Sequence, residues 1–202
     1  MSTTTEQRKL AAIMFTDMVG YTSLAQRDEA LALTLLEEHR QLLRAQFPRF
    51  GGQEIKTLGD GFLLAFASAL EAVRCAMEIQ RALATRNGAA PARHRIDVRI
   101  GLHVGDVVHR DGDVLGDGVN LASRIESLAS PGGICLTQQV LDQLGSQAGL
   151  RFVRLGQGDL KHVQVPVDVY RVVLPWVQTR YPLLGQLAFK LRQRRFRTWA
   201  AV

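Results

Sequence analysis

Two aspartates stand where the sequence predicts the rigid ends of strands. Asp17 closes the apolar stretch RKLAAIMFTD, and Asp60 lies in a Gly-Asp-Gly turn between two strand-like segments. Taken one at a time, such aspartates are usually surface or turn residues. Taken together they suit Mg²⁺, which prefers one or two carboxylates and completes its shell with water and substrate phosphates. The pair therefore indicates metal-assisted phosphate chemistry, in which two ions hold the attacking and the leaving oxygen.

The segment after Asp17 contains groups that can bind phosphate. Val19, Gly20, Tyr21 and Thr22 follow it at the expected start of a helix. Backbone N–H groups at a helix N-terminus point toward anions, so a polyphosphate could lie there. This feature alone is common in proteins and does not identify a site.

A polar pair follows in the stretch DVLGDGVNLASRIE, residues 113–126. Asn120 and Arg124 are four residues apart, so they share one face of the expected helix. One interpretation is an ordinary solvated stripe. The other is functional, because an arginine directed at a phosphoryl group stabilises the charge that develops in a transition state.

The elements that must position these residues follow from periodicity. We expect a buried strand ending at Asp17, a long helix from Thr22 to about Phe47, and a hairpin of QEIKTL and FLLAF around residues 59–61. Ser68 and Glu71 fit a capping box for a helix that continues to residues 87–88.

The second half continues this alternation of strands and helices. IDVRIGLHVGDVVHRDGD predicts a long strand that bends or turns near Gly105 and leads into another near Gly112. A helix over VNLASRIESLA ends at Pro131-Gly132-Gly133, and ICLT, QQVLDQLG, FVRL and PVDVYRVV complete the order. We therefore expect one α+β domain with helices packed against a mostly antiparallel sheet.

The charge is distributed unevenly along the 202 residues. The formal net charge is +6, and from Pro175 onward there are six basic residues and no acidic ones, which leaves 19 of each sign before that point. The formal charge of residues 1–174 is therefore zero, which argues against a domain that binds nucleic acid. We expect a cytoplasmic protein because no apolar run is long enough to span a bilayer and no secretion signal opens the chain. Cys75 and Cys135 lie in apolar patterns, as reduced core cysteines do.

Five stretches, in this order, resemble the catalytic domain of class III nucleotide cyclases, the adenylyl and guanylyl cyclases. They are FTDMVGYTSL, EIKTLGDGFLLAF, GLHVGDVV, GDVLGDGVNLASRIE and LKHVQVPVDVYRV, and the similarity runs from about Lys9 to Leu174. The resemblance implies a ferredoxin-like, palm-type fold. It divides the chain into an N-terminal extension (1–8), the cyclase domain (9–174) and a basic tail (175–202).

The resemblance also implies a role for each motif residue. Asp17 and Asp60 match the metal-binding aspartates, which would hold two Mg²⁺ or Mn²⁺ ions with the help of the Met18 carbonyl. Asn120 and Arg124 match the pair that positions the ribose and stabilises the pentavalent phosphorus. The two residues that match the purine-reading positions are Lys56 and Asp113.

The chemistry of this last pair favours ATP. Adenine offers N1 as an acceptor and its 6-amino group as a donor, which complement a lysine and an aspartate, whereas guanine would need an acceptor where Lys56 stands. The implied reaction is attack of the ATP 3′-hydroxyl on the α-phosphate, giving 3′,5′-cyclic AMP and pyrophosphate. The alternatives are a guanylyl or relaxed-specificity cyclase, a catalytically silent nucleotide-binding dimerisation module, and a polymerase-like palm domain. No residue stands out as the general base.

One departure from the family concerns the outer phosphates. Many members have a lysine just before the GDLK-like segment, where this chain has Leu155 and Gln157, so Arg154 or Lys161 would have to substitute. Family sites form between two domains, one contributing the metal aspartates and the other the remaining groups. Because this chain has both sets, we expect a two-fold homodimer.

The basic tail, residues 175–202, has no counterpart among the five motifs. Residues 183–199 could form a basic amphipathic helix, and such helices lie on anionic membranes. The alternatives are a disordered extension or a linker toward a partner. Peripheral membrane contact is therefore an expectation, which liposome co-sedimentation with and without residues 176–202 would test.

Overall fold

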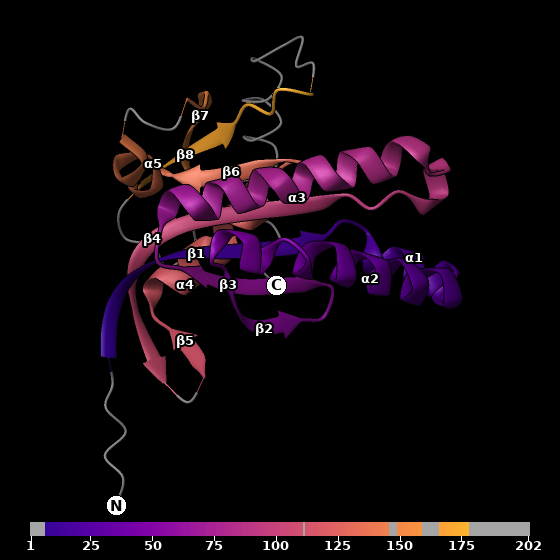
Figure 1. The fold of residues 1–202 in the computed structure, drawn as a ribbon, viewed down its shortest axis with the longest axis horizontal. Helices are drawn as coiled ribbons and strands as arrows, with labels where there is room; N and C mark the ends of the chain where they lie inside the picture. Colours follow the sequence, from indigo (N-terminus) through magenta and orange to yellow (C-terminus); the bar gives the residue numbers. More distant parts are fainter. Residues whose placement is uncertain (1–6, 111, 146–148, 159–165, 178–202) are drawn as a thin grey trace, which may run out of the picture.

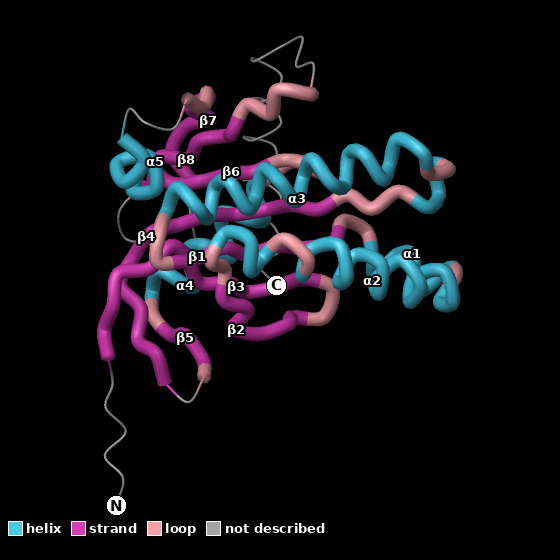
Figure 2. Tube along the Cα trace, viewed as in Figure 1, coloured by secondary structure: helices cyan, strands magenta, loops and turns pink. Residues whose placement is uncertain are grey.

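The computed structural model describes residues 7–110, 112–145, 149–158 and 166–177. Its centre is one sheet in the order β2-β3-β1-β4-β6-β8-β7, with β5 paired to β4 (Figures 1 and 2). Every neighbouring pair is antiparallel except β4 and β6. The strands are β1 (Gln7–Met18), β2 (Gln53–Leu58), β3 (Gly61–Phe66), β4 (Val98–Arg110), β5 (Asp113–Leu115), β6 (Ile134–Thr137), β7 (Phe152–Gly158) and β8 (Val167–Val172).

Helices cover both faces of this sheet. In Figure 1, α2 and α3 lie in front of the central strands and α4 lies behind them. The helices are α1 (Tyr21–Arg27), α2 (Glu29–Arg44), α3 (Ala69–Ala89), α4 (Asp117–Leu128) and α5 (Gln138–Leu144), with 3-10 turns η1 (Phe47–Phe50) and η2 (Ala92–His94). The expectation of an α+β fold with a mostly antiparallel sheet is confirmed.

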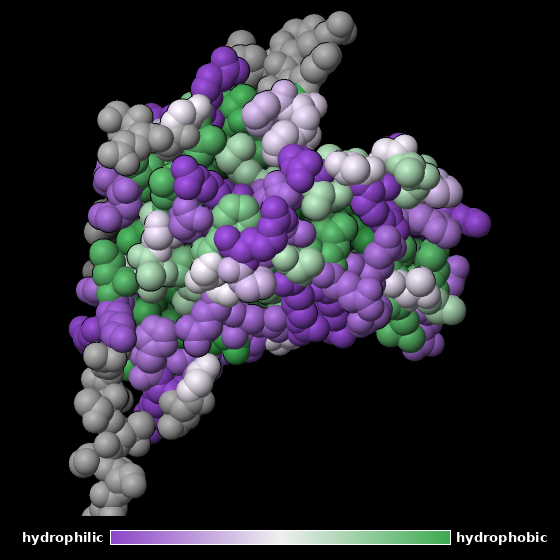
Figure 3. Space-filling model, in the orientation of Figure 1, coloured by the Kyte–Doolittle hydropathy of each residue, from purple (hydrophilic) through white to green (hydrophobic). Residues whose placement is uncertain are grey.

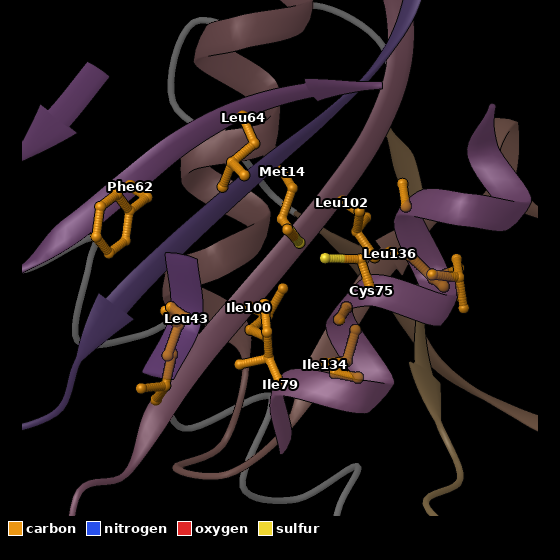
Figure 4. Close-up of a cluster of buried hydrophobic side chains, with 14 of the residues drawn as sticks. Met14, Leu43, Phe62, Leu64, Cys75, Ile79, Ile100, Leu102, Ile134 and Leu136 are labelled. Atoms are coloured by element: carbon orange, nitrogen blue, oxygen red, sulfur yellow. The ribbon is translucent and has the colours of Figure 1, made fainter. Parts of the chain in front are cut away.

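The largest apolar cluster fills the space between the sheet and α2 and α3. Figure 4 shows Met14, Leu64 and Ile100 from the strands meeting Leu43 of α2 and Ile79 of α3, all of them buried. A second cluster lies on the other face, where α4 packs. It comprises Ala11, Ile13, Leu63, Ala65, Val107, Val114 and Ala122. Hydrophilic side chains lie over α2 and α3 on the outer surface (Figure 3).

The structure corrects two expectations about the elements. The long helix expected from Thr22 to Phe47 is divided at Asp28, whose Oδ1 accepts a hydrogen bond from the Leu31 N–H (3.1 Å) and so caps α2. The apolar periodicity of the sequence does not reveal this boundary, because both helices direct apolar residues toward the core. The strand expected to bend or turn near Gly105 does not turn there but continues to Arg110, because Gly105 stays in register with Ala11 of β1.

The ends of the chain are described only in part. Residues 1–6 and 178–202 lie outside the described residues, and so does the expected amphipathic helix at 183–199. Membrane contact through this tail stays a prediction. Within the described part, every helix is too short or too polar to cross a bilayer.

Candidate active site

The pairing of β1 with β3 brings the two predicted metal ligands together. Asp17 is opposite Gly61 in the register, and the Met18 N–H donates to the Asp60 carbonyl (3.3 Å). Gly61 allows this close approach, because a Cβ at that position would lie 2.0 Å from the Thr16 carbonyl oxygen. Asp17, Met18 and Asp60 therefore lie side by side at one end of two adjacent strands.

The two carboxylates influence each other electrostatically. Burial raises the pKa of Asp60, and the negative charge of Asp17 raises it further. A cation already compensates Asp17, since Arg99 Nη2 of β4 donates a hydrogen bond to Asp17 Oδ2. A cation next to Asp60 would relieve its repulsion with Asp17.

Arg99 connects the carboxylate of Asp17, a predicted metal ligand, to α4. Its Nε lies 3.0 Å from Glu126 Oε1, and Glu126 is buried. Burial raises the pKa of Glu126 to about 7, against the opposing effect of the Arg99 charge. Burial by itself would lower the pKa of Arg99, but the bond to Asp17 and the charge of Glu126 raise it.

Arg99 and Glu126 were not among the predicted site residues. Arg99 lies in the strand-like stretch IDVRIGLHV and Glu126 in the helical stretch NLASRIE, and no local pattern assigns either residue a role. Glu126 is two positions after Arg124, so it faces nearly the opposite side of α4 and points to the sheet. Arg99 is 82 positions from Asp17 in sequence, and only the register of β1 with β4 places them together.

The donor set fits a magnesium-type ion whose remaining ligands come from a nucleotide. Two carboxylates and the Met18 carbonyl are hard oxygen ligands, which Mg²⁺ and Mn²⁺ prefer. Among the described residues, no group of three His, Cys, Asp or Glu side chains forms a complete protein cage. Phosphate oxygens and water would therefore have to complete the coordination.

The predicted base-reading residues form an ion pair. Lys56 Nζ of β2 lies 2.7 Å from Asp113 Oδ2 of β5, and the two side chains are 41% and 39% exposed. The bond from Lys56 lowers the pKa of Asp113, and the Val114 N–H adds to this effect. The pair thus presents one donor and one acceptor to solvent.

Asn120 and Arg124 lie one turn apart on α4. Asn120 is exposed and Arg124 is half-buried. Neither side chain has a hydrogen bond or an ion pair within the described part of the chain. Both are therefore available to a ligand.

The predicted phosphate-binding residues are spread over the fold. Val19 donates its N–H to the Asp97 carbonyl (2.8 Å). Gly20, with φ 77°, is the N-cap of the short α1, whose first two residues are Tyr21 and Thr22. Arg154 of β7 forms an ion pair with Asp168 (2.6 Å) at the sheet edge opposite β2. Lys161 lies outside the described residues.

A cleft of about 420 Å³ lies between β4 and the start of α4. It is lined by Arg8, His103 and residues 105–108 and 116–118. None of the predicted site residues lines it.

Comparisons with known proteins identify relatives over most of the chain. A protein named "Putative adenylate cyclase 3" from Rhizobium meliloti (strain 1021) is 38% identical over 165 residues, which cover 81% of this chain and 28% of the relative. The chain thus spans about a quarter of that relative's length.

Two solved structures have the same fold. The crystal structure of an adenylate/guanylate cyclase/hydrolase from Silicibacter pomeroyi has a TM-score of 0.78 at 38% identity, covering 83% of this chain and 98% of that one. The adenylyl cyclase CyaB from P. aeruginosa has a TM-score of 0.73 at 25% identity, covering 87% and 97%. The family described as the adenylate and guanylate cyclase catalytic domain matches residues 3–173, and the chain belongs to this family.

Proposed function

We propose that the chain is an adenylyl cyclase domain, which converts ATP to 3′,5′-cyclic AMP and pyrophosphate. The family includes cyclases of both purines, so membership does not choose between ATP and GTP. The observation that carries the choice is the Lys56–Asp113 pair, whose donor and acceptor are 2.7 Å apart and partly exposed. The 6-amino group and N1 of adenine complement such a pair, and the corresponding edge of guanine does not.

The mechanism assigns a task to each group of residues. Asp17, Asp60 and the Met18 carbonyl would hold two Mg²⁺ or Mn²⁺ ions, which when bound supply Lewis-acid activation of the 3′-hydroxyl. Asn120 would orient the ribose. Arg124 would offset the negative charge that develops on the phosphorus in the transition state.

We also propose that the site is shared between two copies of the chain. The hairpin that carries Asp60 is at one edge of the sheet, while Arg154 is on β7 at the other edge, so one copy cannot direct both at the same triphosphate. A two-fold homodimer resolves this separation, because each site can then take the metal ligands from one copy and the other groups from its partner.

Product analysis tests the proposal. The purified chain is incubated with ATP or GTP and with Mg²⁺ or Mn²⁺, and the products are separated by chromatography. We expect cyclic AMP from ATP and little product from GTP. Lys56→Glu should lose activity with ATP by a factor of about 100 or more, because it would leave N1 of a bound adenine facing an acceptor, and a polar mismatch enclosed by a bound base costs roughly 3 kcal/mol.

Two results would contradict the proposal. Cyclic GMP as the main product would make the chain a guanylyl cyclase. The absence of any cyclic product, from protein shown by calorimetry to bind nucleotide, would favour the silent dimerisation module instead.

A further inference from the structure

The strand that carries Lys56 contains a β-bulge. In the pairing of β2 with β3, Glu54 is opposite Leu64 and Lys56 is opposite Leu63, so Ile55 is an extra residue on β2. Side chains alternate between the two faces of a strand, and one extra residue reverses the alternation beyond it. Without the bulge, Ile55 would occupy the position that Lys56 holds opposite Leu63.

The bulge sorts the neighbouring side chains onto two faces. Glu54 and Thr57 lie on the same face, where Thr57 Oγ1 donates to Glu54 Oε1 (3.0 Å). Ile55 packs on the other face against the cluster around Leu63, and from there Lys56 reaches Asp113. The orientation of Lys56 therefore depends on the bulge staying at Ile55.

Arg44 of α2 connects the residues on both sides of the bulge. Its Nε and Nη2 bind the two carboxylate oxygens of Glu54 (2.9 and 2.8 Å), and Nη2 also donates to Thr57 Oγ1 (3.1 Å). The guanidinium lies 5.2 Å from the centre of the Phe62 ring. An isolated exposed ion pair contributes little, but a bidentate pair within a network holds its partners in one geometry.

We propose that Arg44, Glu54 and Thr57 are positioning residues that hold the bulge at Ile55 and, through it, keep the Lys56 ammonium at Asp113. They would thereby help to set the preference for adenine, although none of them touches the base. This inference rests on the proposed function for its consequence in catalysis. Its structural part, the dependence of the Lys56–Asp113 contact on Arg44 and Thr57, can be measured independently.

The structural part is tested by NMR titration of the Asp113 carboxyl. In the wild-type protein, the bond from Lys56 lowers the pKa of Asp113. Thr57→Val removes one hydroxyl without changing any charge, and Arg44→Met removes the whole connection. In both variants, we expect the pKa of Asp113 to rise toward its ordinary value, more so in Arg44→Met.

Arg49→Met is the matched control. Arg49 also lies over a phenylalanine, Phe50 (5.8 Å), and pairs with a glutamate, Glu78 (3.4 Å). Within the described part of the chain, its side-chain hydrogen bonds and ion pair go to Gln46 and Glu78 and not to β2. Its replacement should leave the titration of Asp113 unchanged. Circular dichroism and urea unfolding verify that each variant is folded under the conditions of the titration.

The catalytic part is tested by comparing ATP with GTP. We expect the ratio of the two kcat/KM values to fall about tenfold in Arg44→Met, mainly through a higher KM for ATP, because base recognition is lost while the metal site is retained. The Mn²⁺ concentration for half-maximal activity should stay the same. Arg44→Lys retains the positive charge but not the planar fork of donors, and it should restore part of the discrimination.

The outcomes separate the two proposals. If the wild type makes cyclic AMP and both variants keep its ATP preference and its Asp113 titration, the positioning inference is wrong and the proposed function stands. If the wild type makes no cyclic nucleotide, the proposed function is wrong. The Asp113 titration then decides the positioning inference alone, and an unchanged pKa in Arg44→Met would overturn it.

Discussion

Charged side chains of the candidate site form ion pairs with one another in the absence of a ligand. Arg99 neutralises Asp17, and Lys56 neutralises Asp113. In the proposed site, a metal ion at Asp17 or a purine at Asp113 would therefore replace an existing contact, so its affinity would be the difference between the new contact and the old one. Asp60 is the exception, since burial and the charge of Asp17 both raise its pKa.

A cation at Asp60 should for this reason stabilise the fold. We expect Mn²⁺ to raise the Tm by several degrees, because a ligand at 100 times its Kd contributes about 2.7 kcal/mol. Asp60→Asn should abolish the shift, and a chelator should reverse it in the wild type. Asp106→Asn, at an exposed position on β4, is the control and should keep the full shift. An equal shift in Asp60→Asn would show that the ion binds elsewhere.

His39 makes the free energy of unfolding depend on pH. Its ring is fully buried beside Phe62, neither nitrogen has a hydrogen-bond partner among the described residues, and burial lowers its pKa to about 4. The unfolded state therefore binds a proton at a higher pH than the folded state, and stability falls as the pH decreases from about 6.5 to about 4.

The variant His39→Phe should remove the His39 contribution to this loss, while the contribution of His103, whose pKa burial also lowers to about 4, should remain. Between pH 7 and pH 4.5, the wild type should lose roughly 2 to 3 kcal/mol more than the variant in urea unfolding with chelator present. His109→Phe replaces a partly exposed ring on β4 and should retain the wild-type acid sensitivity. Parallel curves for the wild type and His39→Phe would rule out His39 as the cause.

Among the elements, α4 is the one whose placement on the sheet affects most of the site. It carries Asn120, Arg124 and Glu126, and its backbone packs directly on β4 at Gly101. A Cβ at Gly101 would lie 2.1 Å from the Glu126 nitrogen and 2.7 Å from the Ala122 carbonyl oxygen. Because these are backbone atoms, rotation of a side chain cannot relieve the overlap.

Gly101→Ala should therefore displace the whole helix. We expect a loss of about 1 to 3 kcal/mol in unfolding free energy and a lower kcat, since Arg124 would move from its position. Gly88→Ala is the matched control: Gly88 lies within α3, and a Cβ there would meet nothing within 4 Å. That variant should be slightly more stable than the wild type. Equal stability of both variants would contradict the close packing at Gly101.

At the scale of the whole molecule, the sheet order separates groups that one triphosphate would need together. The β2–β3 hairpin and β7 lie at opposite edges. The proposed two-fold homodimer brings the edges of two copies together, and it makes a lone copy inactive.

Complementation tests this arrangement. Asp17→Ala removes a proposed metal ligand and Arg124→Ala removes the arginine proposed to stabilise the transition state, so each homodimer should be inactive. In an equal mixture under conditions where dimers exchange, half of the dimers combine one copy of each and contain one intact site, so about a quarter of the wild-type activity should return. Failure to recover activity, with heterodimers shown by mass spectrometry, would exclude the shared site.

The sequence predicted much of the fold because the relevant signals are local. The pattern of apolar residues indicated the strand ending at Asp17 and the hairpin around Asp60. Ser68 caps α3 as expected, because its hydroxyl oxygen accepts a hydrogen bond from the Glu71 N–H (3.3 Å). The boundary at Asp28 was missed because the apolar periodicity continues across it. The continuation of β4 past Gly105 was missed because glycine allows either a turn or a strand, and the pairing with β1 decides between them.

The sequence by itself determined the family, the α+β class and the residue types of the candidate site, because motifs and periodicity are written in consecutive positions. Only the tertiary structure decided which charges face each other. Strand register brings Arg99 to Asp17 and forms the bulge at Ile55. Packing of helices on the sheet buries Glu126 of α4 and brings Arg44 of α2 to Glu54, next to the bulge. These contacts join segments distant in the chain, and no local pattern specifies the geometry between such segments.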